Sequence, residues 1–179
     1  MPYVHRLRRR VGGRYASSCF YVRRMRPAGA GGLGIPRYHQ LDTHSCGFLA
    51  ALAVVRHFAP KTGADDVLRV VAPSPASGCD QRHLIRCLKR FGVAAVYRER
   101  LGPRSLHRLA AAGTPVIVTV WPEWYGCDHW TVVRGLDRAG RVFLTNYNWL
   151  TRNGSMDWKD FLDIWEPRGV GLVCGPAPR

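Results

Sequence analysis

The longest uninterrupted apolar run of the chain covers residues 48–55, and a polar, turn-forming stretch over residues 40–45 comes directly before it. The run is apolar on all sides, which is typical of a helix buried over its whole surface, and Pro60 is expected to end it. Ser45 belongs to the residue types favoured at a helix N-cap. The pattern therefore places Cys46 in the first turn of a buried helix, where unpaired N–H groups and the helix dipole favour an anion.

Shorter helices and strands are predicted along the rest of the chain. The strands at residues 129–136 and 141–147 are joined by a turn at residues 137–140, and two basic segments near the N-terminus are expected to pair as a hairpin. Because most helices precede most strands, the pattern predicts an α+β fold with a mainly antiparallel sheet. Helices are expected at residues 64–71, 80–92, 105–113 and 157–165, and the other strands at residues 4–10, 15–23, 93–97, 115–121 and 170–174.

The positive charge of the chain is concentrated at its N-terminus. The net charge is +15, and residues 1–26 contain eight arginines and no acidic residue. A solvated arm fits this composition, and so does a contact with nucleic acid, an anionic membrane surface or an acidic partner. A glycine-rich stretch follows, so we predict a basic extension and linker over residues 1–34 and one compact domain over residues 35–179.

The sequence shows no sign of export or of membrane insertion. Its longest apolar run has eight residues, far fewer than a membrane span requires. No apolar core of a secretory signal follows the basic N-terminal residues. The six cysteines are an even number, but a chain of this length without a signal needs no disulfide framework. We therefore expect a cytoplasmic protein whose cysteines are mostly reduced.

The helix start at Cys46 and the late hairpin together suggest nucleophilic chemistry. A helix N-terminus can lower a thiol pKa from ~8.5 to roughly 3.5–7.5, although a lone cysteine is more often a small buried hydrophobe. Thiol catalysis also needs a base and a group that orients the base. His129 opens the first strand of the hairpin, and the register set by its turn places both Asn146 and Asn148 on the face of His129. Either asparagine would accept the imidazole N–H, which would direct the other ring nitrogen towards Cys46.

The order of these residues resembles a known family. Gln40, then Cys46-Gly47 at the start of a buried helix, then His129 and Asn146 in successive strands, is similar to papain-like cysteine peptidases. The spacing of Gln40 and Cys46 looks most like that of the bacteriocin-processing, double-glycine-leader peptidases and their stand-alone relatives. The resemblance extends over residues 35–174. It implies a papain-like fold in which a central catalytic helix packs on the sheet.

The resemblance also implies a role for each residue. Cys46 would attack the carbonyl carbon of a peptide or protein substrate and form an acyl-thioester. His129 would be its proton partner and then the general acid for the leaving amine, and Asn146 would orient His129. The Gln40 side chain and the Cys46 backbone N–H would form an oxyanion hole, in which one donor is typically worth ~10²–10³ in kcat. No cofactor is implied.

Two positions depart from the family's usual pattern. The family usually has Asp directly before the nucleophile, where this chain has Ser45, and Asp as the third member, where this chain has Asn146. A neutral orienting group stabilises a protonated histidine less than a carboxylate does. The transporter that often follows these peptidase domains is not seen, so leader cleavage coupled to export is not implied.

Other functions remain open from the sequence. With an amine or thiol acceptor, the same chemistry gives an amidase or acyltransferase. From a different class, the chain would be a binding module whose residues 1–26 hold nucleic acid or an acidic partner. Cys127-Asp128-His129 lacks a second ligand pair, so no metal is expected. An aromatic group is expected either in the core or in a substrate groove: Trp121, Trp124, Tyr125 and Trp130. Four cysteines are interpreted as packing residues: Cys79, Cys87, Cys127 and Cys174.

Overall fold

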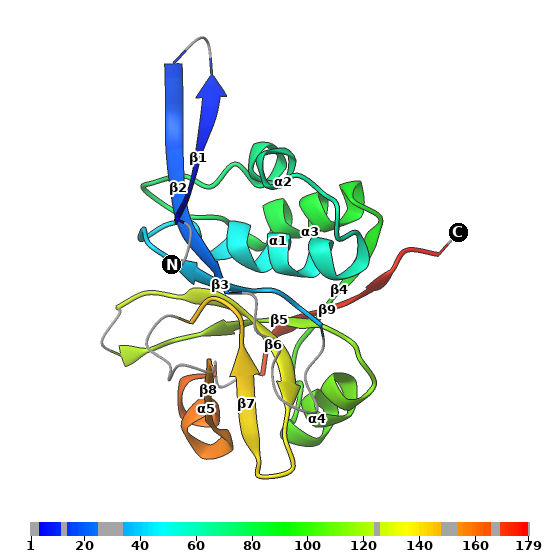
Figure 1. The fold of residues 1–179 in the computed structure, drawn as a ribbon. Helices are drawn as coiled ribbons and strands as arrows, with labels where there is room; N and C mark the ends of the chain where they lie inside the picture. Colours follow the sequence, from blue (N-terminus) through cyan, green and yellow to red (C-terminus); the bar gives the residue numbers. More distant parts are fainter. Residues whose placement is uncertain are drawn as a thin grey trace.

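The computed structural model divides into a helical side and a sheet side. It describes residues 4–11, 14–24, 34–123, 126–147, 154–165 and 169–178. Figure 1 shows the first three helices on one side of the molecule and the large sheet with the last two helices on the other. This arrangement is the α+β architecture that the sequence predicts, with the central helix packed against the sheet.

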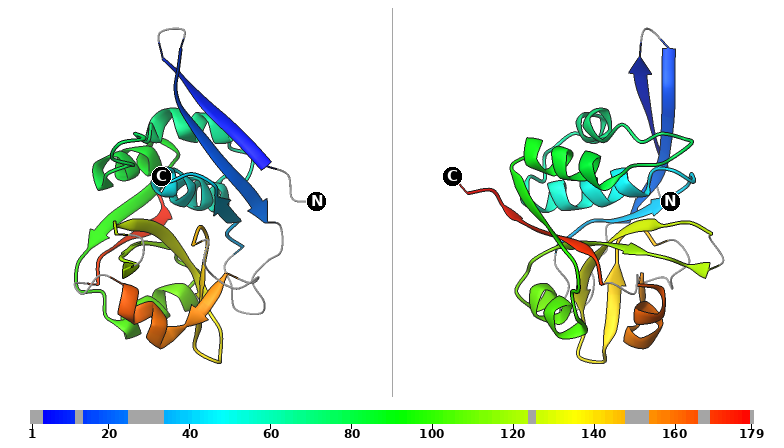
Figure 2. Two further views of the ribbon diagram at one scale, coloured as in Figure 1. Left: turned by 90° about the vertical axis from the view of Figure 1, so that its left-hand side faces the viewer. Right: turned by 180° about the vertical axis from the view of Figure 1, so that it is seen from behind.

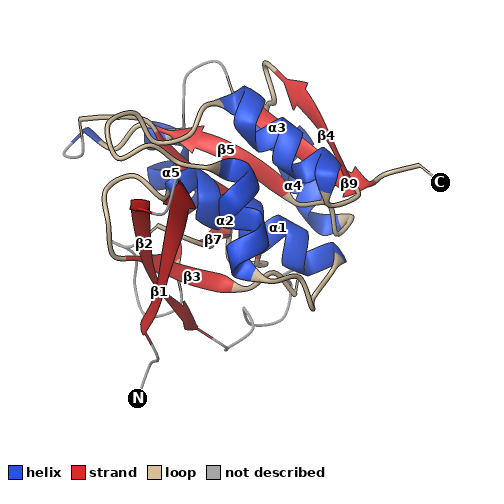
Figure 3. Ribbon diagram, turned by 90° about the horizontal axis from the view of Figure 1, so that it is seen from above, coloured by secondary structure: helices blue, strands red, loops and turns tan. Residues whose placement is uncertain are grey.

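The helical side forms around α1 (Cys46–Phe58), whose first ten residues are all buried. This confirms the predicted central helix, which packs against α2 (Ala64–Val71), α3 (Gln81–Arg90) and strand β6 of the sheet. Seen from above in Figure 3, α1 to α3 lie over the sheet. An aspartate begins α3, because the Asp80 carboxylate accepts a hydrogen bond from the backbone N–H of His83 at 2.8 Å.

The large sheet has six strands in the order β4-β9-β5-β6-β7-β8, and every pairing is antiparallel. Five of these strands were predicted, whereas β8 is three residues long and was not. Two helices that the sequence also predicts, α4 and α5, pack on the sheet side around a second apolar core. The bounds are β4 (Val93–Arg98), α4 (Pro103–Ala111), β5 (Val116–Val120), β6 (His129–Leu136), β7 (Arg141–Leu144), β8 (Ser155–Asp157), α5 (Trp158–Ile164) and β9 (Gly171–Pro176).

The register between β6 and β7 matters because it decides what lies near His129. Val133 pairs with Leu144, which is the predicted register, and an irregularity between Val133 and Gly135 shifts the pairs nearer the turn by one residue. Strand β7 ends at Leu144, three residues earlier than predicted. Asn148, the alternative orienting residue, lies outside the described residues.

The basic N-terminal segment forms the predicted hairpin, β1 (Val4–Val11) and β2 (Arg14–Arg24), which extends past the helices in Figure 2. Its second strand pairs with β3 (Arg37–Gln40), a strand that the sequence did not indicate. Tyr21 on β2 is 1% exposed, and its ring lies edge-on to those of Tyr38 and Phe48. The hairpin therefore shares a core with α1, and the division of the chain at residue 35 stays a prediction.

None of the helices in the described part of the chain is long and apolar enough to cross a membrane.

Candidate active site

The segment between β3 and α1, residues 41–45, is held in shape by one carboxylate. Asp42 Oδ1 accepts hydrogen bonds from the backbone N–H groups of His44 at 3.0 Å and Ser45 at 2.7 Å. Ser45 occupies the N-cap position, but its side chain makes no capping hydrogen bond, so its predicted capping role is wrong. The Gln40 amide nitrogen donates to the Asp42 carbonyl at 2.8 Å, which fixes Gln40 at the end of β3. This segment, called the Cys46 loop below, directly precedes Cys46, which is the first residue of α1.

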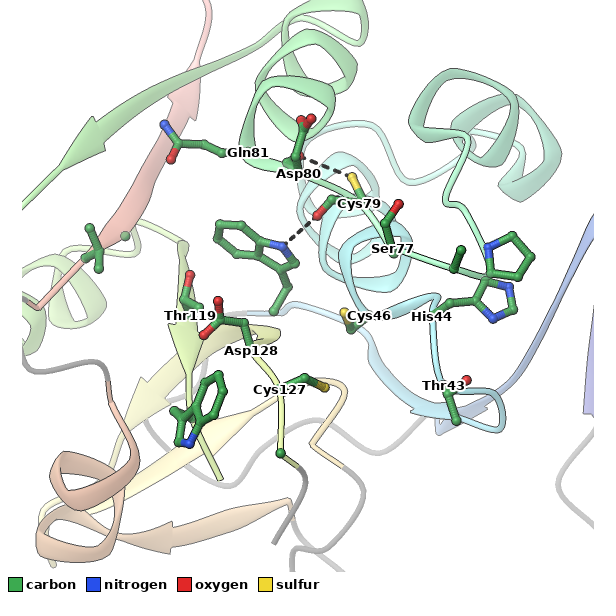
Figure 4. A pocket seen from close by; sticks show the side chains of 18 of the residues that line it. Thr43, His44, Cys46, Ser77, Cys79, Asp80, Gln81, Thr119, Cys127 and Asp128 are labelled. Carbon is green, nitrogen blue, oxygen red and sulfur yellow. Dashed lines mark hydrogen bonds between the residues drawn. The ribbon is translucent and has the colours of Figure 1, made fainter. Parts of the chain in front are cut away.

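Cys46 lies at the edge of a pocket of about 700 Å³, with its side chain among those drawn in Figure 4. The residue is 9% exposed, and burial raises the pKa of its thiol. Hydrogen bonds from the backbone N–H groups of Trp130 and Gly47 to the sulfur act in the opposite direction. Burial is the larger effect, so the pKa of the thiol shifts upward, opposite to the lowering expected from the helix start alone.

His129, at the start of β6, is 1% exposed and directly precedes the residue whose N–H contacts the Cys46 sulfur. Its Nε2 lies 3.0 Å from the backbone carbonyl oxygen of Asn146. A carbonyl only accepts, so Nε2 carries the proton and Nδ1 carries the lone pair of the neutral ring. Burial lowers the pKa of His129 to about 4, and the bond to the Asn146 carbonyl only partly opposes this effect. The imidazole is therefore neutral at physiological pH.

Asn146 connects the elements of the site through both its main chain and its side chain. It is fully buried, and its side-chain amide donates to the carbonyl oxygens of Trp130 at 2.7 Å and Cys46 at 3.2 Å. The sequence led us to expect the side chain to accept from His129, but the main-chain carbonyl occupies that place. The side chain instead joins the start of α1 to β6.

The pocket is formed where the Cys46 loop meets two further segments, residues 75–81 and residues 126–130. Trp121, one of the predicted aromatic group, is 46% exposed and lines the pocket. Trp130 also lines it, and its indole N–H donates to the Cys79 carbonyl at 2.9 Å (Figure 4). The other two aromatic residues of that group, Trp124 and Tyr125, lie outside the described residues.

Of the four residues predicted for the site, Cys46 lines the pocket, whereas Gln40, His129 and Asn146 are buried. Cys127 was interpreted as a packing residue, and this is wrong, because its thiol is exposed at the pocket. The other three cysteines of that group, Cys79, Cys87 and Cys174, are buried.

Sequence reasoning missed two contributors to the site. Asp42 holds the Cys46 loop, and an aspartate three residues before a helix N-cap position is a signal that favours such a turn. The backbone N–H of Trp130 donates to the Cys46 sulfur. Because nearly every residue type has such a donor, the sequence could not indicate it.

No protein-family model matches the sequence, and no curated protein is similar to it at the level of sequence. Three solved structures are similar to it in fold. A double glycine motif protease from an AMS/PCAT transporter, in complex with the leader peptide, has a TM-score of 0.64 and 16% identity over 86% of this chain and 100% of that one. The peptidase domain of Streptococcus ComA, a bi-functional ABC transporter of a quorum-sensing pathway, has a TM-score of 0.59 and 18% identity over 76% of this chain and 95% of that one.

The third structure is the N-terminal peptidase-like domain of the toxin secretion ATP-binding protein from Vibrio parahaemolyticus. Its TM-score is 0.54 and its identity is 14%, over 74% of this chain and 97% of that one. At these identities the likeness is one of fold. The chain has the papain-like fold of the double-glycine peptidases, as its resemblance to the bacteriocin-processing family predicted.

Proposed function

We propose that the protein is a cysteine peptidase that cleaves a peptide or protein amide bond through an acyl-thioester on Cys46. The observation that carries the proposal is the position of Cys46 in the fold. Cys46 is the first residue of α1 and lines a pocket, and its sulfur accepts a hydrogen bond from the backbone N–H of Trp130. The Asn146 side chain donates hydrogen bonds to the carbonyls of Cys46 and Trp130, and Trp130 directly follows His129 in β6. These contacts join the start of α1 to the first two residues of β6, which supports the assignment of Cys46 as nucleophile and His129 as base.

The first step begins from two neutral groups. His129 Nδ1 takes the thiol proton as the Cys46 sulfur attacks the carbonyl carbon of the scissile bond. The electron pair of the carbonyl moves to its oxygen, which then carries negative charge. We assign the stabilisation of this oxygen to the backbone N–H of Cys46 and to the Gln40 side chain, whose position is fixed by its bond to Asp42.

In the second step the imidazolium of His129 returns its proton to the leaving amine, and the carbon–nitrogen bond breaks. This leaves the acyl-thioester on Cys46. A water molecule, deprotonated by His129, attacks the thioester, and the thiol leaves with the proton. The imidazolium that forms in each step is held by the carbonyl dipole of Asn146, since Nε2–H donates to that oxygen at 3.0 Å.

The experiment follows cleavage and the covalent intermediate together. The full chain is incubated with a peptide library that includes sequences with two adjacent glycines, because the similar solved structures include a double glycine motif protease bound to a leader peptide. We expect cleavage products and, on rapid acid quench, a mass increase on the peptide that contains Cys46. Added amines report whether an acceptor other than water also resolves the thioester.

A matched pair of variants tests the assignment of the nucleophile. Cys46→Ala should abolish both cleavage and the mass increase. Cys87→Ala removes another buried cysteine, in α3 and away from the pocket, and should retain both. Equal loss in the two variants, or cleavage that survives Cys46→Ala, contradicts the proposal. Contact between residues 1–26 and nucleic acid or an acidic partner stays a prediction.

A further inference from the structure

Three metal-ligating side chains converge behind the Cys46 loop. The Cys19 sulfur, a carboxylate oxygen of Asp42 and an imidazole nitrogen of His44 all lie within 4.8 Å of one another. Cys19 comes from β2 of the basic hairpin, and the other two come from the Cys46 loop. His44 and Cys46 both line the pocket, and Figure 4 shows the His44 ring pointing away from the Cys46 side chain.

The cluster is shielded from solvent. Cys19 is fully buried, and the side chains of His44 and Asp42 are 12% and 10% exposed. His44 Nδ1 lies 3.6 Å from Asp42 Oδ1, while its other ring nitrogen, Nε2, is buried and has no hydrogen-bond partner among the residues that the structure describes. Burial, together with the nearby Asp42 carboxylate, raises the pKa of the Cys19 thiol to about 12.

Packing alone does not account for this arrangement. Asp42 has a structural task, since it holds the Cys46 loop, and Cys19 fills space in the core of α1. Neither task requires that the sulfur, the carboxylate and the imidazole of His44 point at one place. A buried cysteine in an ordinary core is surrounded by apolar side chains, and a buried imidazole nitrogen is normally hydrogen-bonded.

We propose that Cys19, Asp42 and His44 bind a zinc ion, which joins the basic hairpin to the Cys46 loop. Zinc takes sulfur, nitrogen and oxygen ligands together, with Zn–S near ~2.3 Å and Zn–N and Zn–O near ~2.0–2.2 Å. In a tetrahedral site these lengths place ligand atoms roughly 3.3–3.6 Å apart. The three side chains reach this spacing from within 4.8 Å by an inward movement of about an ångström. Water completes the fourth position, because His44 and Asp42 are partly exposed.

Zinc binding has two consequences for the neighbourhood. The Cys19 thiol must lose its proton to ligate, so binding releases a proton and the affinity rises with pH. The ion also links β2 to Asp42, which accepts hydrogen bonds from the backbone N–H groups of His44 and Ser45. This link reduces the mobility of the chain directly before Cys46. Neither consequence requires peptidase activity, so the two proposals succeed or fail separately.

The test uses Co²⁺ as a spectroscopic probe and Zn²⁺ as its competitor. The full chain is treated with a chelator, dialysed and titrated with Co²⁺, and the thiolate-to-cobalt charge-transfer band is recorded. We expect one equivalent of Co²⁺, a band that Zn²⁺ displaces, and a rise in Tm with Zn²⁺. Cys19→Ser should remove the band, and His44→Gln should weaken binding at least about 100-fold, beyond what loss of a supporting residue costs.

Two control variants decide between this site and other thiols. Cys87→Ser changes another fully buried cysteine and should leave the band and the affinity unchanged. Cys46→Ser should do the same. A band that persists in Cys19→Ser, or one that disappears in Cys46→Ser, would overturn the proposal. If Cys19→Ser does not fold, His44→Gln decides alone, and an unchanged affinity in that variant also overturns it.

Discussion

At the scale of single residues, burial determines the state of the proposed catalytic pair. The thiol of Cys46 has its pKa raised, and the imidazole of His129 has its pKa lowered to about 4. Both shifts favour the neutral forms of the two groups.

The depressed pKa of His129 predicts a loss of stability in acid. The unfolded chain binds a proton at this residue below ~6.5, whereas the folded chain does so only below about 4. Stability contributed by the neutral imidazole is thus complete above ~6.5 and is lost as the pH falls to about 4, by about 3 kcal/mol. Urea unfolding at a series of pH values measures this loss. His129→Gln should flatten the curve in this window, and His107→Gln, at an exposed position, should leave it unchanged.

The side chain of Asn146 predicts an unequal response to two substitutions. Asn146→Asp replaces a donor to two carbonyls with a carboxylate that faces both, and we expect a loss of roughly 3–5 kcal/mol in unfolding free energy. Asn146→Ala removes the donor without adding charge and should cost less. Unfolding titrations of both variants at pH 7 compare them. An aspartate variant as stable as the wild type would show that the amide does not make these bonds in solution.

For the proposed site, the sequence suggested which side chains take part, whereas it could not predict their contacts. Gln40, Cys46, His129 and Asn146 have residue types and spacings that carry information about chemistry. The contacts that hold them use the carbonyl of Asn146 and the N–H of Trp130, which every residue type offers. Burial, which reverses the expected shift of the thiol pKa, depends on what the whole chain packs around Cys46.

At the scale of elements, long patterns were predicted well and short ones were missed. Local sequence defines the helices α1, α2 and α3, because each has an apolar pattern and a proline or a capping aspartate close to one of its ends. The strands β3 and β8 have four and three residues, too few for an alternating pattern to show. Pairing with a strand far along the chain creates β3, and no local signal reports this.

A tight contact between α1 and the segment before α3 gives a prediction at this scale. A Cβ added at Gly47 would lie 2.8 Å from the Cys79 Cβ, closer than side chains approach one another. Alanine is favoured over glycine within a helix by about 1 kcal/mol, but we expect the clash to dominate and Gly47→Ala to lose ~1–3 kcal/mol. Thermal unfolding of Gly47→Ala measures the loss. Gly34→Ala, which meets nothing within 4 Å, is the control.

A second substitution tests whether the contact between Gly47 and Cys79 causes this loss. Cys79→Gly removes the Cβ that obstructs the new methyl group, so the double variant should be more stable than the sum of the two single changes implies. Additive losses would mean that the backbone of α1 relaxes away from Cys79.

At the scale of the whole molecule, the basic hairpin belongs to the fold at one end and extends from it at the other. Strand β2 pairs with β3 and buries Cys19 and Tyr21, while the ends of β1 and β2 away from β3 extend past the helices in Figure 2. Charge composition separated this segment from the rest of the chain. Among the hairpin residues whose burial is described, Cys19 and Tyr21 lie in the core and Leu7 packs against it, which is too sparse a pattern to recognise in the sequence.

This packing predicts that the hairpin stabilises the domain. Tyr21→Ala removes a ring that is 1% exposed and contacts two other aromatic rings, so we expect a loss of about 3–5 kcal/mol in unfolding free energy. Tyr97→Ala, at a position 39% exposed, should cost much less. Urea unfolding of the two variants compares them, and equal stabilities would place the hairpin outside the cooperative unit.

The hydrogen bond from His129 to the carbonyl of Asn146 has a consequence for how such proteins diverge. Every residue type has a backbone carbonyl, and the fold determines where that carbonyl lies. A mutation at position 146 therefore changes the side chain but leaves the carbonyl in place. A change of side chain at the third position of a Cys–His–Asp signature then leaves the acceptor of the histidine in place, even where it costs stability. A descendant without the aspartate keeps an oriented histidine, and its departure from the signature is not evidence that catalysis has been lost.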